Sequence, residues 1–126
     1  METKELTITT KEIANRLVEL CRNGDFETAQ NELFSENASS IEPFASQGFE
    51  KEVNGLKAIK EKGEKWNEMV QEMHGIKISD PLVATNSFAC TMQMDVTMKE
   101  GGKMDMAELC VYQVKDGKII SEEFFV

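Results

Sequence analysis

The chain has 126 residues and a formal net charge of -9, and its Lys and Arg residues are scattered rather than gathered into a basic stripe. A chain of this length is typical of one domain and can bury a stable core without disulfides or bound metals. We therefore predict a single domain over residues 1–126. The acidic balance argues against nucleic acid and anionic membranes as partners.

Two helices are predicted near the N-terminus. Thr9 and Glu12 have the spacing of a capping box, and apolar residues follow at helical spacing until Asn23-Gly24 ends the helix. Asp25 is then placed to cap a short second helix with the sequence FETAQNELF.

The next segment predicts two short strands and a long helix. SENASSIEPF, residues 35–44, reads as a loop leading into a short strand, and residues 45–53 read as a second, irregular one. Asn54-Gly55 opens the third helix, LKAIKEKGEKWNEMV, in which Trp66 lies on the apolar stripe.

From Met73 onward the apolar period changes from helical to two, which indicates strands. The longest is predicted at residues 88–98, followed by a hairpin turn at 100–103. Residues 104–126 read as two strands joined by a tight turn at 115–117, where Asp-Gly is a strong hairpin signal. This order predicts an α+β fold, with helices on one face of a strongly bent antiparallel sheet.

The three cysteines, Cys21, Cys90 and Cys110, lie inside apolar patterns and are odd in number, which predicts reduced, buried thiols and a cytoplasmic location. A single His and the lack of a CxxC or His-Cys cluster predict no metal site, and we expect no cofactor. No apolar run is long enough to span a membrane, and METKELTITTKE lacks the apolar segment of a signal peptide.

Two acids interrupt the apolar strand faces that we expect to point inward. Glu108 and Glu122 share these faces with the residues Met92, Met94, Met104, Met106, Tyr112 and Phe124. An acid in such a place needs a partner, for which His74 and Tyr112 are candidates, and burial should raise its pKa toward that of a general acid or base. A buried structural network or a solvated rim would explain the same acids without catalysis.

The opposite sheet face predicts an interface. Leu109, Val111, Ile119 and Phe125 fall on it by alternation, and no sequence is left to cover them because the helices are needed on the other side. An open apolar patch of this kind predicts a homodimer.

Several motifs together resemble the nuclear transport factor 2-like superfamily, nearest to its SnoaL-like branch. These are Gly24-Asp25 and the short helix after it, "FSENASSIEPF", Asn54-Gly55 at the start of the long helix, and "VYQVKDGKI". The resemblance covers nearly the whole chain. It implies a cone-shaped, cystatin-like α+β fold, in which a bent sheet wraps around the long helix with two further N-terminal helices, and a pocket at the open end.

The resemblance also implies roles for particular residues. Glu42-Pro43 matches the Asp-Pro of ketosteroid isomerase, where the acid is the general base. Leu17 stands where that enzyme has its oxyanion-stabilising Tyr, and Cys110 stands near its second acid, for which Glu108 could partly substitute. Steroid isomerisation is therefore not expected.

Two functions of different classes fit these observations. The first is cofactor-free acid/base catalysis of the isomerase, cyclase or dehydratase type on a small apolar or aromatic molecule, with catalytic residues Glu42, His74, Glu108 and Tyr112. The residues expected to bind the ligand are Trp66, Met92, Met94, Glu122 and Phe124. The second is a non-catalytic small-molecule-binding or protein-interaction domain of the same shape.

Overall fold

The computed structural model describes residues 8–46 and 48–126, so Gln47, within the strand predicted at 45–53, lies outside the described residues. The helices and strands follow one another as α1 (Thr10–Arg22), α2 (Phe26–Leu33), β1 (Phe34–Ile41), β2 (Glu52–Asn54), α3 (Leu56–Met69), β3 (Val70–Ile78), β4 (Leu82–Val83), β5 (Ser87–Met98), β6 (Gly102–Lys115) and β7 (Lys118–Phe125).

The helix boundaries follow local signals in the sequence. The Thr9 hydroxyl accepts from the backbone N–H of Glu12 at 3.1 Å, and the Glu12 carboxylate accepts from the backbone N–H of Thr9 at 3.0 Å. This is the predicted capping box at the start of α1. Gly55 precedes α3 with φ of 95°, a left-handed conformation that glycine adopts without a steric penalty.

The strands form one curved sheet in the order β2-β1-β7-β6-β5-β3, with the short β4 paired to β5. The prediction of an antiparallel sheet holds for every pair except one, because β1 runs parallel to β7. The sheet is therefore mixed. Parallel neighbours cannot be joined by a tight turn, and here the connection from β1 to β7 contains most of the chain.

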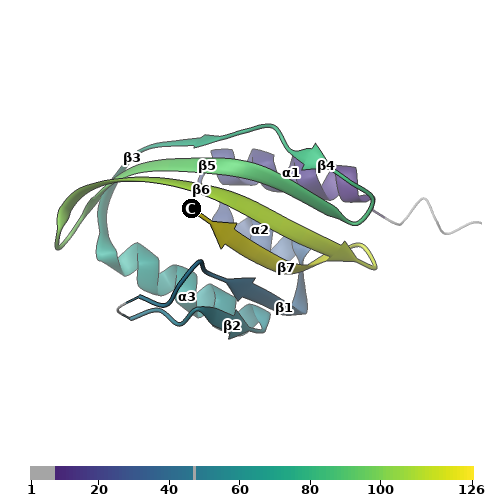
Figure 1. Ribbon diagram of the computed structural model, residues 1–126, viewed down its shortest axis with the longest axis horizontal. Helices are drawn as coiled ribbons and strands as arrows, with labels where there is room; N and C mark the ends of the chain where they lie inside the picture. Colours follow the sequence, from purple (N-terminus) through teal and green to yellow (C-terminus); the bar gives the residue numbers. More distant parts are fainter. Residues whose placement is uncertain (1–7, 47) are drawn as a thin grey trace, which may run out of the picture.

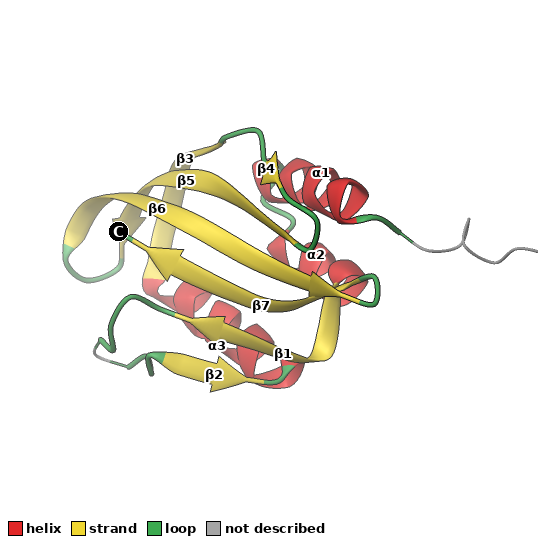
Figure 2. Ribbon diagram, turned by 45° about the vertical axis from the view of Figure 1, so that its right-hand side comes forward, coloured by secondary structure: helices red, strands yellow, loops and turns green. Residues whose placement is uncertain are grey.

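All three helices lie on one side of the sheet, as Figures 1 and 2 show. The main core lies between the helices and the sheet, where buried side chains of α1, α2 and α3 contact the inward faces of the strands. A smaller apolar cluster of Met94, Val96 and Met98 lies on the same side and packs against Trp66 of α3 and Phe26 of α2. This is the predicted α+β arrangement, a strongly bent sheet that wraps around a helical layer.

The inward face of β6 is the one that alternation predicts, since Cys110, Tyr112 and Val114 are buried while Leu109 and Gln113 are exposed. On β5 the residues Phe88, Cys90, Met94, Val96 and Met98 are likewise buried. Long, regular strands keep their alternation, and these two pair along twelve consecutive positions without a register shift.

The prediction that Ile119 lies on the outer sheet face is wrong. Ile119 is fully buried and belongs to the main core. The register shifts between Gln113 and Val114, which pair with Ser121 and Ile119, so Ile120 is an extra residue in β7. A β-bulge of this kind reverses the alternation on one side of itself.

The outer face keeps a smaller apolar patch than predicted. Leu109 and Phe125, which oppose each other across β6 and β7, are each 43% exposed, and Val111 is half-buried. In the described part of the chain, Figure 1 shows β6 and β7 with the helices behind them and no helix in front.

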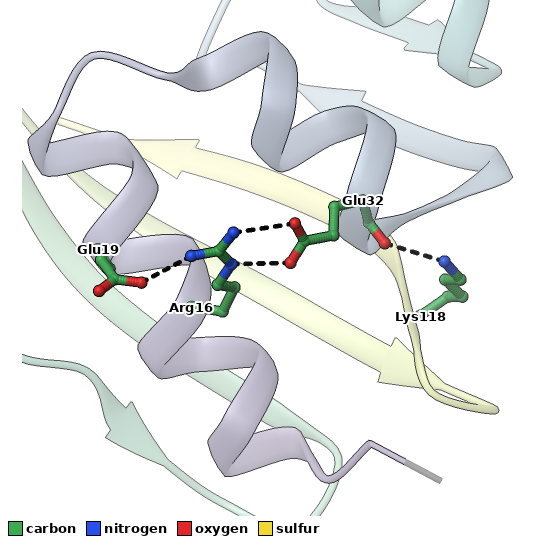
Figure 3. A network of polar contacts seen from close by, with 4 residues as sticks. All are labelled: Arg16, Glu19, Glu32 and Lys118. Carbon is green, nitrogen blue, oxygen red and sulfur yellow. Dashed lines mark hydrogen bonds and ion pairs between the residues drawn. The ribbon is translucent and has the colours of Figure 1, made fainter. Parts of the chain in front are cut away.

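A polar network ties α1 to α2 on the outside of the helical layer (Figure 3). The Arg16 guanidinium donates to both carboxylate oxygens of Glu32, at 2.8 and 3.1 Å, and to Glu19 at 2.8 Å. Lys118 donates to the backbone carbonyl of Glu32 at 3.0 Å, so the network also reaches β7. The Arg16 hydrogen bond lowers the pKa of Glu32. Since these groups are partly exposed, we attribute to the network the relative placement of the two helices rather than much stability.

Candidate functional site

A group of polar side chains lies on the inward side of the sheet, beside α3. The Ser40 hydroxyl donates to Glu122 Oε2 at 2.7 Å, and Lys62 Nζ donates to Ser40 Oγ at 2.6 Å and to Glu42 Oε2 at 2.9 Å. We call Ser40, Glu42, Lys62, Glu108 and Glu122 the inner polar cluster. Ser40 and Glu122 are buried, and the Lys62 and Glu42 side chains are 15% and 26% exposed.

Strand pairing explains why the cluster forms. Ser40 lies directly opposite Glu122 in the parallel pair of β1 and β7. Glu42 lies two residues beyond Ser40, on the same side, and its backbone N–H donates to the Lys51 carbonyl at 2.7 Å. The cluster therefore joins the two parts of the sheet that meet at the parallel pair.

Lys62 was not predicted as a site residue, although a sequence signal for it exists. Ile59, Lys62 and Trp66 are spaced three and four residues apart and so lie on the inward stripe of α3. The Lys62 ammonium also lies over the Phe124 ring, with 5.5 Å from Nζ to the ring centroid. Its positive charge thus lies among three acids and beside one aromatic face.

The surroundings of Glu108 raise the pKa of its carboxyl toward neutrality. Burial, the largest effect, raises its pKa together with the charges of Glu42 and Glu122, and against the opposing charge of Lys62 the pKa rises from 4.5 to about 7. Glu122 follows the same rule, since burial raises its pKa against the opposing effects of the Ser40 hydrogen bond and Lys62. Two carboxyl groups on this surface are therefore biased toward the protonated, hydrogen-bond-donating form.

Tyr112 lies next to the cluster but inside the core. It pairs with Glu122 across the strands and stacks on Phe88, with the ring centroids 4.7 Å apart. Burial raises the pKa of Tyr112 well above its ordinary value, so its phenol stays protonated. Tyr112 is 6% exposed, which places it behind Glu122 rather than on an open surface.

The structure does not bring His74 to these acids, so its predicted place beside them is wrong. His74 Nε2 lies 2.6 Å from the Thr97 hydroxyl, and Thr97 alternates with the buried Val96 and Met98 and therefore points outward. The register of β3 shifts between Met73 and Gly75, and this bulge turns the imidazole to the outer face.

The predicted ligand-binding residues divide between two environments. Glu122 belongs to the inner polar cluster, and Phe124 lies under Lys62. Trp66 and Met94 pack in the smaller apolar cluster, and Met92 contacts both apolar clusters. Met92 therefore links the two apolar clusters, while Glu122 belongs to the inner polar cluster.

The cavity predicted beside Trp66 and Glu108 is not confirmed. One hollow of about 400 Å³ lies between α1 and the segment that joins β3 to β4, where Asn15, Arg22 and Asp80 line it. Another, of about 530 Å³, lies between β1 and the start of α3, where Leu56 and Lys60 line it. Neither hollow is lined by a residue of the inner polar cluster. Within residues 8–46 and 48–126, no group of His, Cys, Asp and Glu side chains is arranged to hold a metal ion.

The family model of the SnoaL-like domain matches residues 8–126. The chain belongs to this SnoaL-like family. The predicted resemblance is thereby confirmed, and the inner polar cluster lies within the matched part of this SnoaL-like domain.

Solved structures agree with this membership. A protein from Mesorhizobium loti, proposed to be a SnoaL-like polyketide cyclase and also labelled carbohydrate phosphatase, is 33% identical, with a TM-score of 0.86, and the match covers 94% of this chain and 100% of that one. An NTF2-like protein of unknown function from Burkholderia pseudomallei K96243 is 11% identical, covering 94% and 91% with a TM-score of 0.77. TerC, co-crystallised with polyporic acid, is 16% identical, covering 90% and 88% with a TM-score of 0.74. The last two matches show the fold alone.

No curated protein matches the sequence of this SnoaL-like domain. Among its described helices, none has the length and apolar character needed to cross a membrane.

Proposed function

We propose that this SnoaL-like domain is a cofactor-free acid/base catalyst that acts on a small apolar or aromatic molecule. The observation that carries the proposal is Glu108, a half-buried carboxyl whose pKa is about 7 and which lies on the same surface as the Lys62–Glu42 ion pair. A group that titrates near neutrality gains and loses a proton readily at the pH of a cell.

The geometry supports different roles for the two acids. Lys62 donates to Glu42 Oε2 at 2.9 Å, which fixes the position of this carboxyl group and suits the role of a base. Glu108, biased toward its protonated form, is suited to donate a proton or a hydrogen bond to the same substrate. Tyr112 would act only through Glu122, because it is enclosed by the core.

The surface beside Glu108 supports an apolar substrate. Met92 lies opposite Glu108 across β5 and β6, and Met106 and Met104 follow at alternate positions on β6. Met104 and Met73, which flank the buried Val96 from both sides, are 42% and 39% exposed. Thioether side chains adapt to ligands of varied shape. That TerC was co-crystallised with polyporic acid adds a precedent on the same fold.

Proton exchange in heavy water tests the proposal without a known substrate. We expect the protein to accelerate deuterium uptake next to the carbonyl group of a small apolar or aromatic ketone, with a pH dependence centred near the pKa of Glu108. Glu108→Gln should abolish the acceleration, whereas Glu100→Gln, in the exposed turn between β5 and β6, should retain it. Ketones that bind without any exchange would favour the alternative, a non-catalytic binding domain.

The stability of Glu108→Gln should depend on pH in a defined direction. Between its ordinary pKa of 4.5 and its folded pKa of about 7, Glu108 holds more proton in the native state, so the free energy of unfolding falls as pH rises through this window. Without the carboxyl, we expect a shallower fall and a gain on the order of 1 kcal/mol relative to wild type at pH 8, discounted for partial exposure. Urea unfolding at pH 5 and pH 8 measures both, and equal pH profiles would place Glu108 in water.

We further propose a homodimer through the outer sheet face. Leu109, Val111 and Phe125 would form its centre, with the exposed Gln93 and Gln113 at the rim. Val111→Asp would bury a charge at this centre, so we expect sedimentation to show monomers of the variant and dimers of the wild type. A wild-type monomer at micromolar concentration would contradict the proposal.

Two further proposals concern the chain as a whole. One domain over residues 1–126 is supported by the match of the family model to residues 8–126. A cytoplasmic location is supported by three free, buried thiols.

A further inference from the structure

All three cysteines of the protein meet in one part of the core. Cys21 lies on α1, Cys90 on β5 and Cys110 on β6, and all are free and buried. Cys90 and Cys110 share the main core with Cys21, and the charge of an ionised Cys90 is close enough to raise the pKa of Cys21. The thiols are not used by the proposed acid/base chemistry.

Cys90 and Cys110 lie directly opposite each other in the antiparallel pair of β5 and β6. The next residues along the same face are paired in the same register, with Phe88 opposite Tyr112 and Met92 opposite Glu108. Opposed residues in an antiparallel pair have their Cα atoms about 4.5 or 5.5 Å apart. Both separations fall within the range of roughly 4.4 to 6.8 Å that a disulfide bridges, so the strands need not move apart or slide to join the two sulfurs.

We propose that Cys90 and Cys110 form a reversible disulfide that responds to peroxide and clamps β5 to β6 beside the inner polar cluster. The disulfide would lie next to Glu108 on the inward face of β6, where Cys110 is opposite Phe124 of β7. Oxidation would thus restrain the strand that carries Glu108.

The oxidation balances with hydrogen peroxide as the two-electron oxidant. The Cys90 sulfur attacks one peroxide oxygen, the O–O bond breaks, and the thiol proton leaves with the departing oxygen as water. The Cys110 sulfur then attacks the resulting sulfenic acid, the S–O bond breaks, and the Cys110 proton leaves in a second water. Two thiols are oxidised to one disulfide while the peroxide is reduced to two waters.

The environments of the thiols favour this pair over one that includes Cys21. The neighbouring Cys110 thiol lowers the pKa of Cys90 against the effect of its burial, and the Arg22 charge lowers it too. Burial raises the pKa of Cys21 to about 12. Since the thiolate is the nucleophile, Cys90 reacts first, and its nearest neighbour on the paired strand resolves the product.

Peptide mapping after mild oxidation tests the pairing. Trypsin separates the three cysteines, because Cys21 falls in peptide 17–22, Cys90 in 78–99 and Cys110 in 104–115. Hydrogen peroxide, the oxidant of the proposed step, is the probe, and diamide, which takes two electrons and two protons from a pair of thiols and becomes the hydrazine, is used beside it because it spares the methionines. From the folded protein we expect a linked 78–99/104–115 peptide that dithiothreitol separates, together with an alkylated, unlinked 17–22 peptide.

Two controls distinguish the folded geometry from random pairing. Protein oxidised in urea should give a mixture of all three pairings, and Cys21→Ser should still give the 78–99/104–115 link when folded. Cys110→Ser should abolish that link, and if this variant does not fold, the wild-type map decides alone. A link from Cys21 to Cys90 as the main product, or no link in the folded protein where the urea sample is oxidised, would overturn the proposal.

Discussion

Lys62→Met is expected to lower the free energy of unfolding by about 2 kcal/mol at pH 8 and by clearly less at pH 5. Lys62 donates to Ser40 and Glu42 and lies near Glu108 and Glu122, so its loss leaves three acids without their shared cation. At pH 5 the carboxyl of Glu108, with a pKa of about 7, is neutral and needs no cation. The methionine retains the length and the apolar stem of the lysine, so packing changes little.

Urea unfolding followed by circular dichroism at both pH values measures this difference. Lys57→Met is the matched control, because Lys57 is an exposed lysine on the same helix and should change stability little at either pH. An equal loss at pH 5 and pH 8 would show that Lys62 stabilises the fold through packing rather than through its charge.

Ile119→Ala should cost about 2–4 kcal/mol of stability, the cost of a cavity at a fully buried position. Phe125→Ala, on the same strand, should cost less than about 1 kcal/mol when both substitutions are made in the monomeric Val111→Asp variant, because the ring is 43% exposed in one protomer. Uninterrupted alternation would put both residues on the outer face, so the contrast tests the bulge at Ile120 directly. Thermal or urea unfolding of the two variants gives the answer, and a larger loss for Phe125→Ala would contradict the register of β6 and β7.

Local signals account for the parts of the fold that the sequence predicted well. The capping box of Thr9 and Glu12 involves residues three apart, and the turn at 115–117 joins strands that are adjacent in the chain. Each is set by side chains within a few residues, which a single sequence displays. The parallel pairing of β1 with β7 depends instead on contacts between distant segments, which no local pattern marks.

Both misplaced residues lie at strand irregularities. His74 and Ile119 are each next to a register shift, in β3 and β7, where one extra residue reverses the faces. A prediction based on alternation continues unchanged through such a residue, because nothing in the sequence marks the position of the β-bulge. Glu108 and Cys110, on the regular part of β6, were placed on the correct face.

The inner polar cluster was predicted in part for the same reasons. Glu108 and Glu122 are expected on inward faces because acids among apolar strand residues stand out, and Glu42 is expected through the match of Glu42-Pro43 to the Asp-Pro of ketosteroid isomerase. Lys62 does not stand out, because a lysine in a charged helix usually faces water. Only the tertiary structure shows that its ammonium is held by Ser40 and Glu42.

The parallel pair of β1 and β7 also has a consequence for the order in which the protein folds. The hydrogen bond from Ser40 to Glu122 joins residues 82 positions apart, and β1 and β2 reach the rest of the sheet only through β7. The hairpin of β5 and β6 needs only neighbouring residues and can form early, whereas closing so long a loop is slow. Ser40, Glu42 and Lys62 would therefore meet Glu108 and Glu122 only in the last step of folding, and any intermediate with a complete β5–β6 hairpin would still lack the site.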